Sequence, residues 1–111
     1  MKDNSLYLHH ILDCIEKIER FTGDDRDEFM KSELVQDAVI RNLQMLSESV
    51  KQIPDRLKDP YPSIDWRAIA AFRNILVHEY LGVNMERVWE VVASDLPPLN
   101  KAILSMLEKC K

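Results

Sequence analysis

The chain has 111 residues and a formal net charge of −4, with 15 Lys and Arg residues against 19 Asp and Glu residues. This length suits one domain, residues 1–111, that buries roughly 60 to 70% of its unfolded surface. The negative charge excludes a protein that is basic over its whole surface, so any contact with nucleic acid must be local. Neither of the two cysteines, Cys14 and Cys110, has a nearby partner for a metal site. The small number of cysteines fits a reducing cytoplasm.

The composition favours helices throughout. The chain has only two glycines and five prolines, so few positions favour turns. The residues that favour or pack in helices are plentiful: Leu, Ile, Val, Met, Ala, Glu and Lys. We therefore predict an all-α protein, an up-and-down bundle of four main helices with one short extra helix. The first residues are too polar for a signal peptide or a membrane span, which predicts a cytoplasmic protein without membrane insertion.

The N-terminal third predicts two helices. Apolar residues recur every three or four positions over residues 7–21, the pattern of an amphipathic helix. The Thr22-Gly23-Asp24 segment should end this helix. Asp25 and, three positions later, Glu28 resemble a capping box that opens a short helix through about Met30.

A longer helix is predicted over residues 32–53, where one apolar stripe continues without a break until Pro54. Three prolines, Pro54, Pro60 and Pro62, then favour an extended connection rather than a helix. Tyr61 is expected to pack this connection onto the rest of the protein.

The clearest helix signals surround residues 66–80. Asp65 can cap the first turn, and Ile64 and Ile69 have the spacing of a hydrophobic staple. Gly82 is expected to close the helix in the left-handed conformation that glycine adopts easily.

The C-terminal part should form a helix that is kinked or interrupted near Pro97 and Pro98. Asn84 is a good N-cap for its first segment. Asp95 can cap a further segment in which the two prolines are tolerated at the start.

Three side chains suited to phosphate chemistry, Arg73, His78 and Tyr80, stand at short spacing in the otherwise apolar helix over residues 66–80. At about 100° per residue, Arg73 and Tyr80 share a face, whereas Arg73 and His78 are roughly 140° apart. Joint action on one substrate therefore requires the Arg73 side chain to wrap around the helix, or a second copy of the chain to complete the site. The second option predicts a symmetric dimer with this helix near the two-fold axis.

An Arg and a His are what a metal-free ribonuclease needs, because the His takes the proton of the 2′-hydroxyl and the Arg neutralises charge on the phosphate. A non-catalytic interpretation is also open: Arg73 pairs with an acid such as Glu79, His78 caps the helix and Tyr80 packs. A metal site at His9 and His10 is disfavoured, because adjacent helical residues point about 100° apart and no acid completes a ligand set.

The segment Arg73-Asn74-x-x-x-His78-x-Tyr80 resembles the Arg-x-x-x-x-His-x-Tyr motif of HepT toxins, which belong to the HEPN ribonuclease superfamily and act in HepT/MntA toxin–antitoxin pairs. The chain departs from the family at Ser47-Glu48-Ser49, where Gly-Glu-Ala is common. Similar flanking segments extend the resemblance over nearly the whole chain, namely residues 36–43, Asp65-Trp66-Arg67, Val88-Trp89 and Asp95-Leu96-Pro97.

The resemblance implies a metal-independent endoribonuclease without a cofactor, whose cleft combines Arg73 and His78 of two protomers in a homodimer or higher symmetric oligomer. It implies that Asn74 orients the site or contacts RNA. It also implies that a cognate MntA-like nucleotidyltransferase, the antitoxin, attaches AMP to Tyr80. Two alternatives remain: a non-catalytic substrate-binding or adaptor subunit of a nucleotidyltransferase, and a dimer in which these polar residues only fasten the interface.

Overall fold

The computed structural model describes residues 4–78 and 82–110, and every described element is helical. The helices predicted over residues 7–21, 25–30 and 32–53 are found within a few residues of those bounds, and the predicted end of the helix over residues 66–80 lies outside the described residues. In chain order the elements are α1 (Asn4–Thr22), α2 (Arg26–Lys31), α3 (Glu33–Gln52), α4 (Asp55–Lys58), α5 (Trp66–His78), α6 (Met85–Glu90), the π-helical segment η2 (Val91–Asp95) and α7 (Leu96–Lys109).

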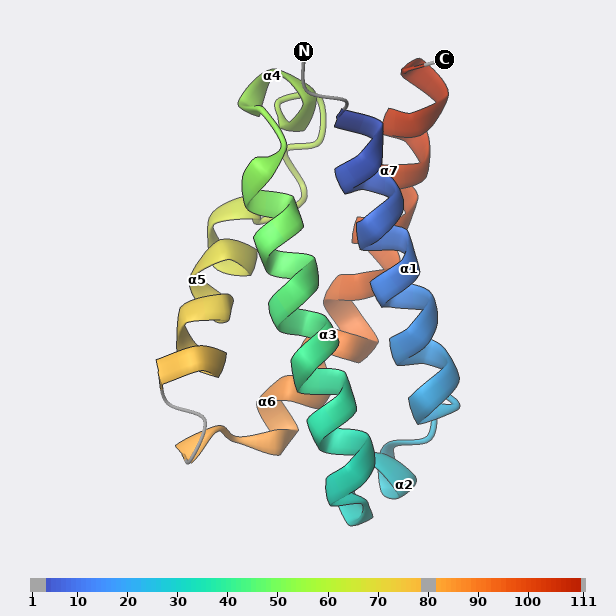
Figure 1. The fold of residues 1–111 in the computed structure, drawn as a ribbon, viewed down its shortest axis with the longest axis vertical. Helices are drawn as coiled ribbons and strands as arrows, with labels where there is room; N and C mark the ends of the chain where they lie inside the picture. The colour runs from blue at the N-terminus through green and yellow to red at the C-terminus, as the bar shows by residue number, and fades with distance from the viewer. Residues whose placement is uncertain (1–3, 79–81, 111) are drawn as a thin grey trace.

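The long helices form an up-and-down bundle, as predicted (Figure 1). Helix α3 packs against both α1 and α5, and α7 packs against α1. Successive long helices run in opposite directions, so α1 begins and α7 ends at the same end of the bundle (Figure 1). Helix α5 therefore lies at the edge of the bundle, beside α3.

The core is formed where α1, α3 and α7 meet, and it extends to α2, α5 and α6. Phe29 of α2 is fully buried and lies against Trp89, with ring centroids 5.5 Å apart. Such aromatic pairs contribute about 0.5–1.5 kcal/mol beyond their buried area. Within residues 4–78 and 82–110, no helix combines the length and the hydropathy that crossing a bilayer requires.

The predicted caps at Asp25, Asp65 and Asn84 are confirmed. Each side chain accepts a hydrogen bond from a backbone N–H of the following first turn. The break after α1 is also confirmed, since Gly23 and Asp24 both adopt the left-handed conformation with φ of 58° and 57°. The left-handed closure predicted at Gly82 is wrong, because the φ angle of Gly82 lies outside that region. Glycine permits this conformation without imposing it.

The prediction of an extended connection after Pro54 is also wrong, because Asp55–Lys58 forms one helical turn, α4. Pro54 itself is extended, with φ −67° and ψ 150°, and a proline is compatible with the start of a helix because it needs no hydrogen-bond acceptor there. Tyr61 packs as predicted, and its hydroxyl donates to Ser105 Oγ of α7 at 2.7 Å.

The predicted interruption near the two prolines is confirmed as η2, the π-helical segment directly before α7. Pro97 and Pro98 follow in the first turn of α7, where their rings would crowd the carbonyls four residues earlier in a regular α-helix. The wider π turn relieves this crowding. Asp95 does not cap α7, because its backbone is helical and its side chain makes no capping hydrogen bond.

The two cysteines should differ sharply in reactivity. Cys14 is 2% exposed, and burial raises the pKa of its thiol, whereas Cys110 is exposed. Because the thiolate is the reactive form, we expect iodoacetamide at pH 8 to alkylate Cys110 in the folded protein and to leave Cys14 unmodified. Peptide mass spectrometry checks this, with protein unfolded in guanidinium as the control in which both react. Equal labelling of both cysteines in the folded protein would contradict the burial of Cys14.

Candidate functional site

Helix α5 has one face against the bundle and one face in solvent. Phe72 and Leu76 are buried, and Arg73 beside them is half-buried. The opposite face is exposed and mixes small apolar and polar side chains: Arg67, Ala68, Ala71, Asn74, Ile75 and His78. The motif is therefore divided, with Arg73 on the inner face and both Asn74 and His78 on the outer face.

Arg73 reaches across to α3. Its Nη2 lies 2.6 Å from Glu48 Oε1, and its Nη1 lies 3.5 Å from Asn74 Oδ1. Its Nε is buried and has no hydrogen-bond partner among the described residues. The guanidinium is thus held by one strong charge-assisted contact, and its Nε–H is left unsatisfied.

A groove between α3 and α5 contains Arg73. Three acids and two bases line it, so the groove carries no excess of positive charge in the single chain. A phosphate that approaches Arg73 through the groove therefore passes carboxylates. The lining residues are Glu33, Gln36, Asp37, Ile40, Arg41, Gln44, Met45, Glu48, Arg73, Leu76, Val77 and Met85.

His78 lies outside this groove. It is exposed, and no hydrogen bond or ion pair joins it to Arg73 in the part of the chain that the structure describes. Its position five residues after Arg73 separates the two by roughly 140° around the helix. The single chain therefore brings Arg73 and Asn74 together but leaves His78 apart. Tyr80 lies outside the described residues.

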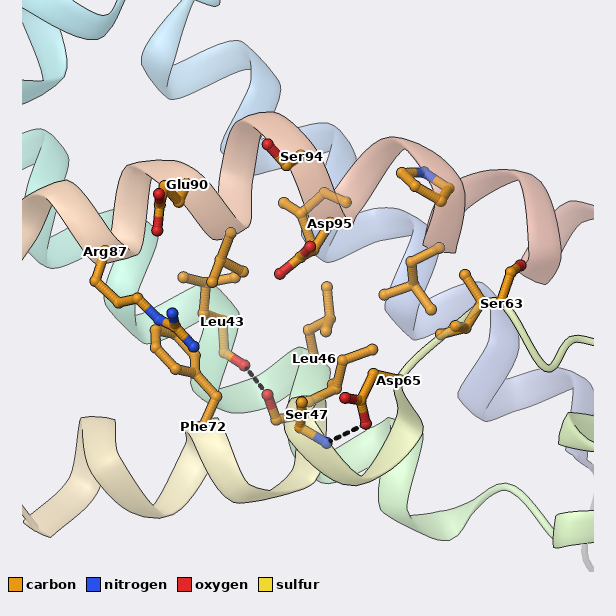
Figure 2. Close-up of a pocket in the computed structure, with 17 residues that line it drawn as sticks. Leu43, Leu46, Ser47, Ser63, Asp65, Phe72, Arg87, Glu90, Ser94 and Asp95 are labelled. Atoms are coloured by element: carbon orange, nitrogen blue, oxygen red, sulfur yellow. Dashed lines mark hydrogen bonds between the residues drawn. The ribbon is translucent and has the colours of Figure 1, made fainter.

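A second cavity lies on the other side of α5, facing α6, η2 and the start of α7 (Figure 2). Leu43, Leu46 and Phe72 contribute apolar surface to it, and Arg87 and Asp95 extend from the helices opposite α5 (Figure 2). Its lining includes neither Arg73, Asn74 nor His78. The candidate site is therefore the groove that contains Arg73, and not this cavity.

No group of three or more His, Cys, Asp or Glu side chains is placed to hold a metal ion within residues 4–78 and 82–110. The His10 ring instead contacts Ser49 Oγ through Nδ1 and lies 3.7 Å from Cys14 Sγ through Nε2. His10 thus joins α1 to α3, while His9 is exposed. Helix α3 still packs against α1 at the Ser47-Glu48-Ser49 departure. Both serine hydroxyls have a partner, because Ser47 Oγ donates to the Leu43 carbonyl at 2.8 Å and Ser49 Oγ contacts His10 Nδ1.

Glu48 is the residue of this site that the sequence analysis did not identify. The non-catalytic interpretation expected Arg73 to pair with an acid, but it suggested Glu79, which lies outside the described residues. The observed partner stands 25 positions earlier, on another helix. No sequence spacing points to this pairing, because the two residues stand on different helices.

Comparison with known proteins identifies the relatives of this chain. A "Putative RNase" of Caldanaerobacter subterraneus subsp. tengcongensis is 36% identical over the full length of both chains. A "Probable ribonuclease HepT" of Thermococcus cleftensis is 39% identical over 84% of this chain and 86% of its own.

A further relative, from Methanocaldococcus jannaschii, is named "Gamma-glutamylcyclotransferase and putative RNase". It is 41% identical over 97% of this chain, which spans only 49% of that longer protein. No solved structure matches the chain. The family described as ribonuclease HepT-like matches residues 11–106. The chain therefore belongs to the HepT-like ribonuclease family.

Proposed function

We propose that this protein is the toxin of a toxin–antitoxin pair, an endoribonuclease that cleaves RNA without a metal ion at a cleft shared by two protomers. The observation that carries the proposal is the division of the motif on α5. Arg73 lies in a groove, and His78 lies on an exposed face of the same helix. Neither residue alone provides both proton transfer and charge stabilisation.

The proposed reaction is transfer of a phosphoryl group within the RNA. His78 takes the proton of a 2′-hydroxyl, and the 2′-oxygen forms a bond to the adjacent phosphorus. The bond from phosphorus to the 5′-oxygen breaks, and that oxygen takes a proton from water as it leaves. Arg73 stabilises the negative charge on the phosphate oxygens, and Asn74, next to the guanidinium, orients it or contacts RNA. The products are a 2′,3′-cyclic phosphate and a 5′-hydroxyl.

The outer face of α5 supports a dimer. Ala68, Ala71 and Ile75 have the i, i+3, i+7 spacing of one helix stripe and are exposed, with Ile75 at 41%. Small apolar residues allow two helices to approach closely. The stripe lies about 160° around α5 from Arg73. A shared site therefore requires the two-fold axis to lie beside the sector of α5 between His78 and Arg73, where Asn74 is exposed, so that His78 of one protomer approaches Arg73 of its partner.

The direct test is incubation of the purified protein with RNA in the presence of EDTA. We expect cleavage to persist and to yield cyclic-phosphate ends. Loss of cleavage in EDTA, with recovery on addition of Mg²⁺, would contradict the metal-independent mechanism. RNA that stays intact under all conditions, together with tight binding of a nucleotidyltransferase, would instead identify a non-catalytic adaptor.

We further propose that a cognate nucleotidyltransferase inhibits the toxin by attaching AMP to Tyr80. The added phosphate would place bulk and negative charge near Arg73, because residues seven apart share a helix face when the helix continues. Co-expression with a nucleotidyltransferase encoded beside this chain should increase the intact mass by AMP. Tyr80→Phe should remove the mass increase and restore toxicity, while Tyr61→Phe, in the α4–α5 connection, should leave both unchanged. An unmodified parent chain that is nevertheless neutralised would contradict this proposal.

A further inference from the structure

We propose that Glu48 is a positioning residue that holds the Arg73 guanidinium in the orientation required for RNA cleavage. This inference rests on the proposed function, because it assigns Arg73 a role at the phosphate. It concerns a residue outside the motif, on α3 rather than on α5. The ion pair between these two side chains carries it.

The contact between the two side chains is short and lies at the groove surface. Arg73 Nη2 is 2.6 Å from Glu48 Oε1, within the range of a charge-assisted hydrogen bond. The side chains are 36% and 47% exposed, so the pair is neither buried nor fully solvated. An isolated pair at this exposure contributes little to stability. Its consequence is therefore geometric: it selects one orientation of a long side chain.

The other guanidinium nitrogens do not fix that orientation. Nε is buried without a partner among the described residues, and Nη1 reaches Asn74 Oδ1 only at 3.5 Å. Without Glu48, the guanidinium could rotate to satisfy Nε with water or another acceptor. With Glu48 in place, the guanidinium Nε faces the protein interior, and Nη1 lies on the side of the guanidinium next to Asn74. In the proposed site, this side of the guanidinium would contact the RNA phosphate.

Glu48 has two opposing effects on RNA. Its carboxylate repels phosphate, as do those of Glu33 and Asp37 in the same groove, so its removal should not weaken RNA binding. It also preorganises Arg73, whose guanidinium stays protonated in either case. Loss of preorganisation lowers the rate of the chemical step. A positioning role therefore predicts a lower kcat without a higher KM.

The kinetic test compares Glu48→Ala, Glu48→Gln and Glu16→Ala. We expect Glu48→Ala to lower kcat by roughly ten- to a hundredfold with an unchanged or lower KM. Glu48→Gln, which keeps an acceptor for Nη2, should recover most of this loss. Glu16→Ala breaks another exposed ion pair, with Arg20 on α1 and outside the groove, and should leave kcat unchanged. An unchanged kcat in Glu48→Ala would overturn the inference, and an increased kcat would overturn it by showing that Glu48 masks Arg73.

Side-chain NMR provides a readout that does not depend on activity. The Nε–H signal of Arg73, assigned by its loss in Arg73→Lys, should be rigid in the parent protein and mobile in Glu48→Ala. The exposed Arg56, on α4 and outside the groove, serves as the mobile reference. Equal mobility of Arg73 in both proteins would overturn the inference even if RNA cleavage is confirmed. A parent chain that cleaves no RNA, with Arg73 released in Glu48→Ala, would instead overturn the proposed function and leave the positioning contact established.

Discussion

Replacing Arg73 or His78 by alanine is expected to reduce RNA cleavage by roughly 100- to 10,000-fold. General acid–base catalysis contributes about 10²- to 10⁴-fold to rates, and one group that stabilises developing charge contributes about 10²- to 10³-fold. Neither side chain belongs to the buried core, so both variants should remain folded. Initial rates of cleavage of a defined RNA measure the effect, and growth of cells that express each variant without its partner should recover.

Arg67→Ala is the matched control for Arg73→Ala. Arg67 lies on the same helix, carries the same charge and faces solvent, so its loss should change cleavage only a few-fold. Size-exclusion chromatography of His78→Ala separates catalysis from assembly. A dimer without activity fits the proposed mechanism, whereas a weakened dimer with unchanged activity per dimer would show that His78 only fastens the interface. Growth as poor as with the parent chain would contradict both catalytic roles.

The second large effect concerns the attachment of α5 to the bundle. Leu76→Ala should lower the free energy of unfolding by about 2–5 kcal/mol, because the Leu76 side chain is 0% exposed and its truncation leaves a cavity. Only Phe72 and Leu76 are buried among the described residues of α5, so the loss of one removes a large share of its anchoring. Urea unfolding at one fixed protein concentration measures the change.

Leu34→Ala provides the control, since it makes the same substitution at a position of α3 that is 81% exposed. It should change the free energy of unfolding by less than about 0.5 kcal/mol. An equal loss of stability in the two variants would show that Leu76 is not packed as described. A loss of RNA cleavage in folded Leu76→Ala protein would also show that the position of α5 matters to the site.

Local signals were sufficient to predict most of the fold. Caps at Asp25, Asp65 and Asn84 act within one turn, so residue type and spacing identify them directly. The interruption before Pro97 follows from proline sterics. The errors occurred where a residue permits several conformations: Gly82 is not left-handed, and Pro54 precedes a helical turn rather than an extended connection.

The candidate site was predictable only in part. The spacing of Arg73 and His78 already showed that they lie on different faces of one helix, and the structure places one in a groove and the other on the exposed face. The pairing of Arg73 with Glu48 was not predictable, because it depends on the relative positions of α3 and α5. Helical periodicity identifies the face on which a residue lies but not the residue opposite it.

The claim that two protomers share each site can be tested by mixing two inactive variants. Arg73→Ala and His78→Ala chains would be co-expressed with different tags, and the mixed dimer isolated by sequential affinity steps. If Arg73 of one protomer acts with His78 of its partner, the mixed dimer keeps one complete site of two and should recover about half of the parental activity. A mixed dimer as inactive as either variant alone would contradict the shared site.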